Sequence, residues 1–371
     1  MGRPVAVGRR RTAAPEPVHW WIGLSILALV VAFSPVPPWA VDQFYAREMY
    51  PWLQTWLTTA TNLLPIAVLD VLLIALLALG GIRAGRLWMT ARNWGAIAAV
   101  WELVRRVIRM AALVTLMFLW TWGCHYRRLP LEAALAGNQA AEPTAQMLRH
   151  AVADANGLAA RLRPSVTTAS PSYDQLASAL REPMNMALAT LKRPPLGAPG
   201  RPKFSLLLTP YFTAAGINGM INPFALEAIV HPDLLPFERA FVIAHEWGHL
   251  AGQADEAEAS AVGWLACMNG TTATAYSASL YLIMEGIAAL PPDDRRAAMA
   301  GIDPDVRADL EAIAERMAKH RPIVRRTAER AYDEFLKANQ VDDGTASYGR
   351  ALQLILASPI YDAMGSFRPN R

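Results

Sequence analysis

The chain has 371 residues, of which 53% are hydrophobic and 18% are charged, whereas soluble globular proteins average about 45–50% and about 25%. This composition excludes an intrinsically disordered chain and indicates that some apolar surface faces lipid. The first 124 residues contain eleven arginines, no lysine and five acids, a net charge of +6, and the remainder carries −2. Because the basic charge is confined to the first third, we expect no nucleic-acid partner.

Three apolar runs in the first third predict membrane-spanning helices, at residues 20–35, 63–82 and 110–124. Each run, with a few flanking residues, approaches the length that crosses about 30 Å of hydrocarbon. The first run is interpreted as an uncleaved anchor rather than a signal peptide, because two more runs follow and no small-residue cleavage site ends it. Asp70, inside the second run, is expected to face the helix bundle rather than to have a function of its own.

The arginines predict how these spans are oriented. They gather in the N-terminal tail and between the second and third runs, whereas Arg47 is the only one between the first and second runs. The positive-inside rule therefore places the tail in the cytoplasm and everything after Cys124 outside it. This predicts a multi-pass protein of the inner cell membrane. Residues 91–110 are expected to form an amphipathic helix on the inner membrane surface.

The rest of the chain has the pattern of a mostly helical soluble domain. A Pro/Gly-rich linker is predicted at residues 192–203, and glycine and proline residues separate the secondary-structure elements that follow. Short strands are expected at residues 204–209 and 217–221. Helices are expected at residues 144–162, 173–191, 237–250, 255–268, 276–290, 305–319, 323–337 and 348–357.

The motif His-Glu-Trp-Gly-His at residues 245–249 predicts a metal-binding catalytic site. Residues four apart share one face of a helix, so His245 and His249 can reach one metal ion. Zinc accepts neutral imidazole nitrogens and favours tetrahedral coordination. Glu246 lies one residue from His245, so it flanks the metal, where it can take a proton from a zinc-bound water.

Two histidines leave a zinc ion short of ligands, and the next candidates are Glu256 and Glu258. Gly252 ends the first helix, and Asp255 can cap a second that returns beside it. Glu256, Ala259 and Gly263 then share one face, whose small residues allow close helix packing. Since each helical residue turns about 100°, Glu258 points away from Glu256 and only one of the two can bind. We favour Glu256 and keep Glu258 as the alternative.

Residues 256–260 resemble the E-x-x-A-[DN] signature of gluzincin metallopeptidases, whose first Glu is the third zinc ligand. The chain more closely resembles a bacterial membrane family of unknown function, which has three N-terminal spans followed by an HExxHxxG…ExEAN metallopeptidase-like domain. The matching segments are residues 122–128, 216–219, 223–224, 245–259, 343–344 and 347–350.

This resemblance implies a gluzincin-type zincin fold and supports Glu256 as the third ligand. It also draws attention to Tyr348, in a matching segment, as a candidate for stabilising the transition state. Ser260 departs from the signature, which has Asp or Asn there to orient a ligand histidine. Ser260 can still form a hydrogen bond, although its reach is shorter.

We therefore predict a mainly helical protein with three transmembrane helices followed by an α+β zincin-like domain with a small sheet. The expected parts are a cytoplasmic tail (1–19), a membrane anchor (20–124), a helical region with a linker (125–203) and a metallopeptidase domain (204–371). The expected activity is that of a zinc metalloendopeptidase, with zinc as cofactor, lipid around the anchor, and peptide or protein substrates in the cell envelope. The alternative is a non-catalytic zinc-binding protein of the envelope.

Overall fold

The computed structural model describes residues 19–131, 142–166, 171–339, 348–358 and 361. These residues are mainly helical, as predicted, and their only sheet has two strands. The predicted cytoplasmic tail arginines and the motif residues 343–347 lie outside the described residues. Contacts group the chain into two units, one of residues 1–35 and 81–119, the other of residues 36–80 and 120–371. Residues 36–80, expected to belong to the membrane anchor, thus pack in the unit that contains the HExxH motif.

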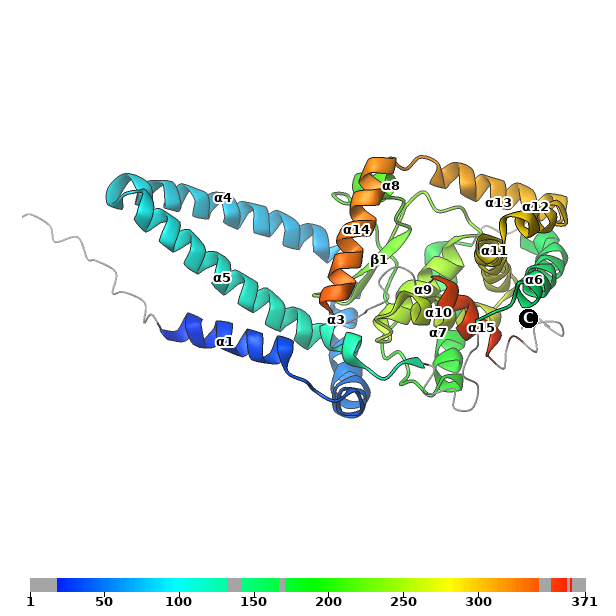
Figure 1. Cartoon of the computed structure of the whole chain (residues 1–371), viewed down its shortest axis with the longest axis horizontal. Helices are drawn as coiled ribbons and strands as arrows, with labels where there is room; N and C mark the ends of the chain where they lie inside the picture. The colour runs from blue at the N-terminus through cyan, green and yellow to red at the C-terminus, as the bar shows by residue number, and fades with distance from the viewer. Residues whose placement is uncertain (1–18, 132–141, 167–170, 340–347, 359–360, 362–371) are drawn as a thin grey trace, which may run out of the picture. The chain divides into compact units, whose positions relative to one another are not determined.

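The smaller unit is built from apolar helices (Figure 1). They are α1 (His19–Phe33), the second half of α4 (Val68–Trp94) and most of α5 (Ala96–Thr121). Gly95, with a φ of +88°, separates α4 from α5. The amphipathic helix expected at residues 91–110 is therefore not a separate element, because this glycine divides that stretch between two long helices.

Among the described residues, α4 is the one helix long and apolar enough to cross a membrane, over residues Val68–Asn93. A second candidate is obtained if residues Trp20–Phe33 and Pro38–Asn62 are counted together as one broken span. α1 has only 15 residues, and α5 carries Glu102 with its two arginine partners, Arg105 and Arg106. The three predicted runs are thus all helical, and one or two of them meet the length and composition of a span.

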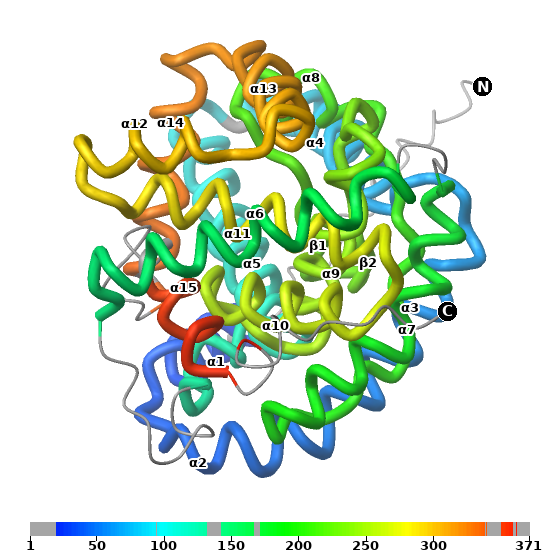
Figure 2. Tube along the Cα trace, turned by 90° about the vertical axis from the view of Figure 1, so that its right-hand side faces the viewer, coloured from blue at the N-terminus to red at the C-terminus, as the bar shows by residue number. Residues whose placement is uncertain are grey.

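The larger unit contains the remaining elements, with α10 near its centre (Figure 2). They are α2 (Pro38–Ala40), the π-helix η1 (Val41–Met49), α3 (Tyr50–Asn62), the 3₁₀-helix η2 (Gly123–Arg127), α6 (Ala145–Val166), α7 (Tyr173–Thr190), α8 (Thr209–Ala215), β1 (Gly219–Asn222), β2 (Glu227–Val230), α9 (Arg239–Leu250), α10 (Glu256–Met268), α11 (Thr272–Ala289), α12 (Pro292–Ala300), α13 (Pro304–Met317), α14 (Pro322–Ala338) and α15 (Tyr348–Leu356).

The helix α10 forms the core of this unit, packed against α7, α9, α11 and α15. Every residue from Ala257 to Met268 is buried, as expected of a helix that is apolar and small-sided all round. Cys267 is one of these buried residues, and neither it nor Cys124 forms a disulfide.

The two strands β1 and β2 run antiparallel, with Gly219 opposite Val230 and Asn222 opposite Glu227. The strand expected at residues 217–221 is therefore confirmed with a shift of two residues, whereas β2 was not predicted. The strand expected at residues 204–209 is wrong. There the Asp70 carboxylate accepts hydrogen bonds from the Ser205 hydroxyl and the Leu206 backbone N–H, which holds a turn that leads into α8.

Within the larger unit, buried acids hold the first turn of α4 in place. The carboxylate of Glu227, on β2, accepts hydrogen bonds from the N–H groups of Val68 and Leu69, at 2.9 and 2.8 Å. Free N–H groups at a helix start favour an anion, so Glu227 caps α4 from a distant strand. The buried Lys203 Nζ neutralises this carboxylate at 2.9 Å. Asp70 likewise accepts hydrogen bonds from Ser205 and Leu206 in the turn before α8, rather than only facing the apolar helices as expected.

Candidate metal centre

Helices α9 and α10 bring His245, His249 and Glu256 together. The Nε2 atoms of His245 and His249 lie 3.2 and 3.5 Å from the same carboxylate oxygen of Glu256, Oε2. One donor atom from each residue lies within 4.8 Å of the other two. The side chains of His245 and Glu256 are 18% and 28% exposed, so the cluster is open to solvent on one side. The sequence-predicted ligand set is thus assembled in space.

Local backbone features set this geometry, as the sequence indicated. Gly252 has a φ of +84°, a left-handed conformation that lets the chain turn back after α9. The Asp255 carboxylate then accepts a hydrogen bond from the Glu258 N–H and caps α10. Two glycines let the helices nearly touch. A Cβ on Gly248 would lie 2.9 Å from the Ala259 carbonyl oxygen, and a Cβ on Gly263 would lie 2.9 Å from the His245 backbone nitrogen.

Hydrogen bonds to the far nitrogens orient both imidazoles. Nδ1 of His249 donates to the Gln253 carbonyl oxygen at 2.7 Å, and Nδ1 of His245 lies 3.1 Å from the Ser260 hydroxyl. Both Nε2 atoms therefore point at Glu256. Outer contacts of this kind hold metal-binding histidines in place. Ser260 occupies the position where the gluzincin signature has Asp or Asn, and its hydroxyl still reaches the ring.

Glu246 lies beside the cluster and is not part of it. Its side chain is buried, and its Oε2 atom has no hydrogen-bond partner among the residues that the structure describes. Burial raises the pKa of Glu246 to about 7, although positive charge on His245 and His249 acts to lower it. A Cβ at Gly219 would lie 2.6 Å from Glu246 Oε1, so only glycine leaves room for the carboxylate beneath β1. These properties suit a group that exchanges protons near neutral pH.

The charges at the cluster fit a bound cation. Burial acts to lower the pKa of His249, but the adjacent Glu256 carboxylate has the larger effect and raises this pKa to about 9. Burial conversely raises the pKa of Glu256, and the two imidazoles hold it well below its usual value. A proton on His249 thus offsets the negative charge of Glu256, as a metal ion at this position would do. Two imidazole nitrogens and one carboxylate oxygen are a common protein ligand set for catalytic zinc.

Glu258, the alternative ligand, points elsewhere. Its carboxylate accepts a hydrogen bond from the Leu131 N–H at 2.8 Å and lies 3.7 Å from Arg193 and 3.5 Å from Arg350. As the helical angle predicted, only Glu256 faces the two histidines. Glu258 instead belongs to a buried charge cluster that joins α10 to the segment after η2.

The structure adds one residue that the sequence did not indicate. The hydroxyl of Tyr332, on α14, donates a hydrogen bond to Glu256 Oε1 at 2.5 Å, across 76 residues of sequence. This leaves Oε2 of Glu256 for the histidines. No motif surrounds Tyr332, so only the tertiary structure reveals it. Tyr348, the sequence-based candidate for transition-state stabilisation, begins α15, but its side chain lies outside the described residues.

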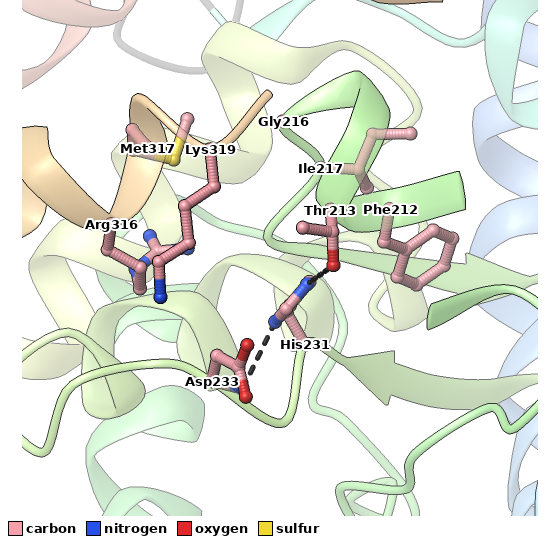
Figure 3. Close-up of a pocket in the computed structure, with 9 residues that line it drawn as sticks. All are labelled: Phe212, Thr213, Gly216, Ile217, His231, Asp233, Arg316, Met317 and Lys319. Carbon is pink, nitrogen blue, oxygen red and sulfur yellow. Dashed lines mark hydrogen bonds between the residues drawn. The ribbon is translucent and has the colours of Figure 1, made fainter. Parts of the chain in front are cut away.

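A separate pocket lies near the start of β1 (Figure 3). In it, His231 Nε2 lies 2.9 Å from the Thr213 hydroxyl, and His231 Nδ1 accepts a hydrogen bond from the Asp233 N–H. His231 is 3% exposed, so this histidine is buried although it lies in a loop directly before a proline. Both ring nitrogens are used in holding the loop after β2, which gives His231 a structural role.

Comparison with known proteins places the chain in a family. The family described as "Protein of unknown function (DUF3810)" matches residues 45–356, and the chain belongs to it. No curated protein and no solved structure matches the chain. The match covers α3, α4, α5, the HExxH motif, Glu256 and Tyr332, whereas α1 lies outside it.

Proposed function

We propose that this member of the DUF3810 family is a zinc-dependent metalloendopeptidase of the bacterial cell membrane. In this proposal α1, α4 and α5 form a three-helix anchor, the N-terminus is cytoplasmic, and the larger unit has a zincin-like fold outside the cytoplasm. The observation that carries the proposal is the convergence of His245, His249 and Glu256, with a buried carboxylate, Glu246, beside them. A purely structural metal site has no need of that additional base.

Each residue has a defined part in the proposed reaction. His245, His249 and Glu256 would hold zinc, which when bound acidifies water and polarises a carbonyl group. Glu246 takes a proton from the attacking water and delivers it to the amine that leaves. Its pKa of about 7 allows both transfers near neutral pH. Tyr332 positions Glu256 through its hydrogen bond.

The free edge of β1 supports a peptide as substrate. The N–H of Val230 donates to the Lys203 carbonyl and the N–H of the next residue, His231, donates to the Asn218 carbonyl, so successive residues of this segment bond to opposite sides. By the antiparallel register, the N–H and C=O groups of Gly219 and Ile221 then point away from β2. No other described strand pairs there.

This edge suits an extended peptide, which adds to a sheet through its main-chain groups. Gly219 lies directly against Glu246, so a peptide bound along β1 would pass the proposed proton acceptor. A small-molecule substrate would have no use for a row of main-chain donors and acceptors. The edge strand therefore favours peptide hydrolysis over other zinc chemistry.

The test uses the full chain, purified in detergent, with Glu246→Gln as the active-site variant. Glu311→Gln is the matched control, because Glu311 is exposed on α13. Both variants and the parent should bind zinc equally. Only the parent and the control should create new peptide N-termini in a mixed peptide library, detected by mass spectrometry. Unchanged cleavage by Glu246→Gln refutes the mechanism, and zinc binding without any cleavage by the parent supports the non-catalytic alternative.

A further inference from the structure

We propose that the larger unit is itself seated in the lipid surface, through an apolar belt consisting of Trp39, Trp52, Trp56, Leu63, Leu206 and Leu207. This inference rests on the membrane anchoring in the proposed function and is independent of the peptidase activity. All six side chains are exposed, with Leu63 and Leu206 at 80% and 83%. Exposed apolar residues scattered singly need no explanation, but several of them near the start of one apolar helix mark a contact surface.

Helix α3 carries its polar side chains inward and its tryptophans outward. The inward side chains donate to distant carbonyl oxygens of the unit: Tyr50 to Leu250, and Gln54 to Ala198. The outward face carries Trp52 and Trp56, 62% and 63% exposed, with ring centroids 6.2 Å apart. A helix surrounded by water shows the reverse arrangement. This inversion indicates that the outer face of α3 meets an apolar phase.

The belt also lacks charge. The 21 residues from 49 to 69, which include α3 and the start of α4, contain no charged side chain, and neither do residues 204–212. By contrast α14, on the same unit, carries four arginines and lysines and three acids. A tryptophan-rich surface without charges is typical of the membrane–water interface, where the indole rings are preferred.

The belt adjoins the point at which α4 begins. Leu63 lies five residues before Val68, and the backbone N–H of Leu206 donates to the Asp70 carboxylate in the first turn of α4. The two parts of the belt therefore flank the first turn of the helix that is long and apolar enough to span a membrane. The start of a spanning helix lies at the lipid surface, so the belt shares that depth. This continuity favours lipid, rather than a protein partner, as the occupant.

The test measures where belt residues lie in the full chain, reconstituted in vesicles of phosphatidylethanolamine and phosphatidylglycerol. A background with Cys124→Ser and Cys267→Ala removes the native thiols. Single cysteines at belt positions, Trp52→Cys and Leu207→Cys, receive a nitroxide label. Collisions with oxygen, which concentrates in lipid, are compared with collisions with a water-soluble nickel complex. Because both positions are exposed, the substitutions leave the packing of the unit intact.

Three reference positions complete the experiment. Leu76→Cys, exposed on α4, reports lipid, and Arg181→Cys on α7 and Glu311→Cys on α13 report water. We expect the belt labels to collide more often with oxygen, like the α4 label and unlike the two water references. Belt labels that favour nickel, with the α4 label still in lipid, overturn the belt and leave the anchor standing. Belt labels shielded from both reagents show a protein contact and also overturn it. An α4 label in water refutes the membrane anchor, and the belt with it.

Discussion

Replacing Gly263 with alanine should separate the two helices that carry the metal ligands. A Cβ at this position would lie 2.9 Å from the backbone nitrogen of His245 and 3.1 Å from the carbonyl carbon of Ala244. All the atoms it meets belong to the α9 backbone, which cannot rotate away as a side chain can. The only relief is for α10 to move outward, and it would take Glu256 with it.

The magnitude follows from these distances. Carbon atoms rest at about 3.5–4.0 Å, so the helices must part by roughly half an ångström. Overpacking of this kind costs about 1–3 kcal/mol, offset by about 1 kcal/mol because alanine is the better helix former. We expect a net loss of about 0–2 kcal/mol in the free energy of unfolding. Since Glu256 moves away from both histidines, zinc affinity should fall by roughly tenfold, which corresponds to about 1.4 kcal/mol.

The assay is chemical unfolding of the detergent-solubilised full chain in the presence of a chelator, so that bound metal does not contribute to stability. Zinc affinity is measured separately by competition with a chromophoric chelator. Gly157→Ala is the matched control, because a Cβ there meets only a flexible arginine atom at 3.7 Å, and it should stabilise α6 by about 0.5–1 kcal/mol. If Gly263→Ala stabilises the protein as the control does and zinc affinity is unchanged, close helix packing does not set the ligand geometry.

Three further changes test other parts of the structure. Tyr332→Phe removes the hydrogen bond to Glu256 and should weaken zinc affinity by about tenfold or more; equal affinity in both proteins would show that the contact is incidental. Lys203→Met leaves the buried Glu227 carboxylate without its cation and should lower the free energy of unfolding by about 3–5 kcal/mol. A second change, Glu227→Gln, should restore part of this loss. No recovery in the double variant would contradict the ion-pair argument. Burial holds the pKa of His125 well below its usual value of 6.5. As pH falls, His125 is therefore protonated in the unfolded chain before it is protonated in the folded chain. The free energy of unfolding then decreases as pH falls below about 6.5. Relative to the parent, His125→Phe should therefore gain up to about 2 kcal/mol between about pH 7 and about pH 5, and a pH-independent difference would refute the assignment.

The metal cluster was predictable because its determinants are local. His245 and His249 share a helix face, and Gly252 and Asp255 fix the turn that brings Glu256 back beside them. The helical angle showed that Glu256 and Glu258 could not both bind, and the small residues on the face of Glu256 favoured it over Glu258. The periodicity likewise predicted α6, α7, α9, α10, α11, α13, α14 and α15, within a few residues at their ends, whereas the short helices α8 and α12 were not predicted.

The features that the sequence did not reveal depend on distant partners. Residues 204–209 have the composition of a strand, yet the Asp70 carboxylate, far away in sequence, holds them in a turn. Tyr332 reaches the cluster only because α14 crosses the unit. Residues 38–62 were not predicted to be helical, because α3 buries polar groups and exposes tryptophans, the inverse of the pattern used to recognise a soluble helix.

Helix α3 has one further consequence, which concerns the distance between the proposed active site and the bilayer. Its inner face binds the end of α9 through Tyr50 and Leu250, one residue beyond His249, and its outer face carries the belt. A single helix, about 10 Å across, thus acts as a spacer of fixed thickness. Under the two proposals made above, the enzyme would select a peptide bond by its height above the membrane, and lengthening or shortening a substrate's juxtamembrane stalk would move the cut site by the same number of residues.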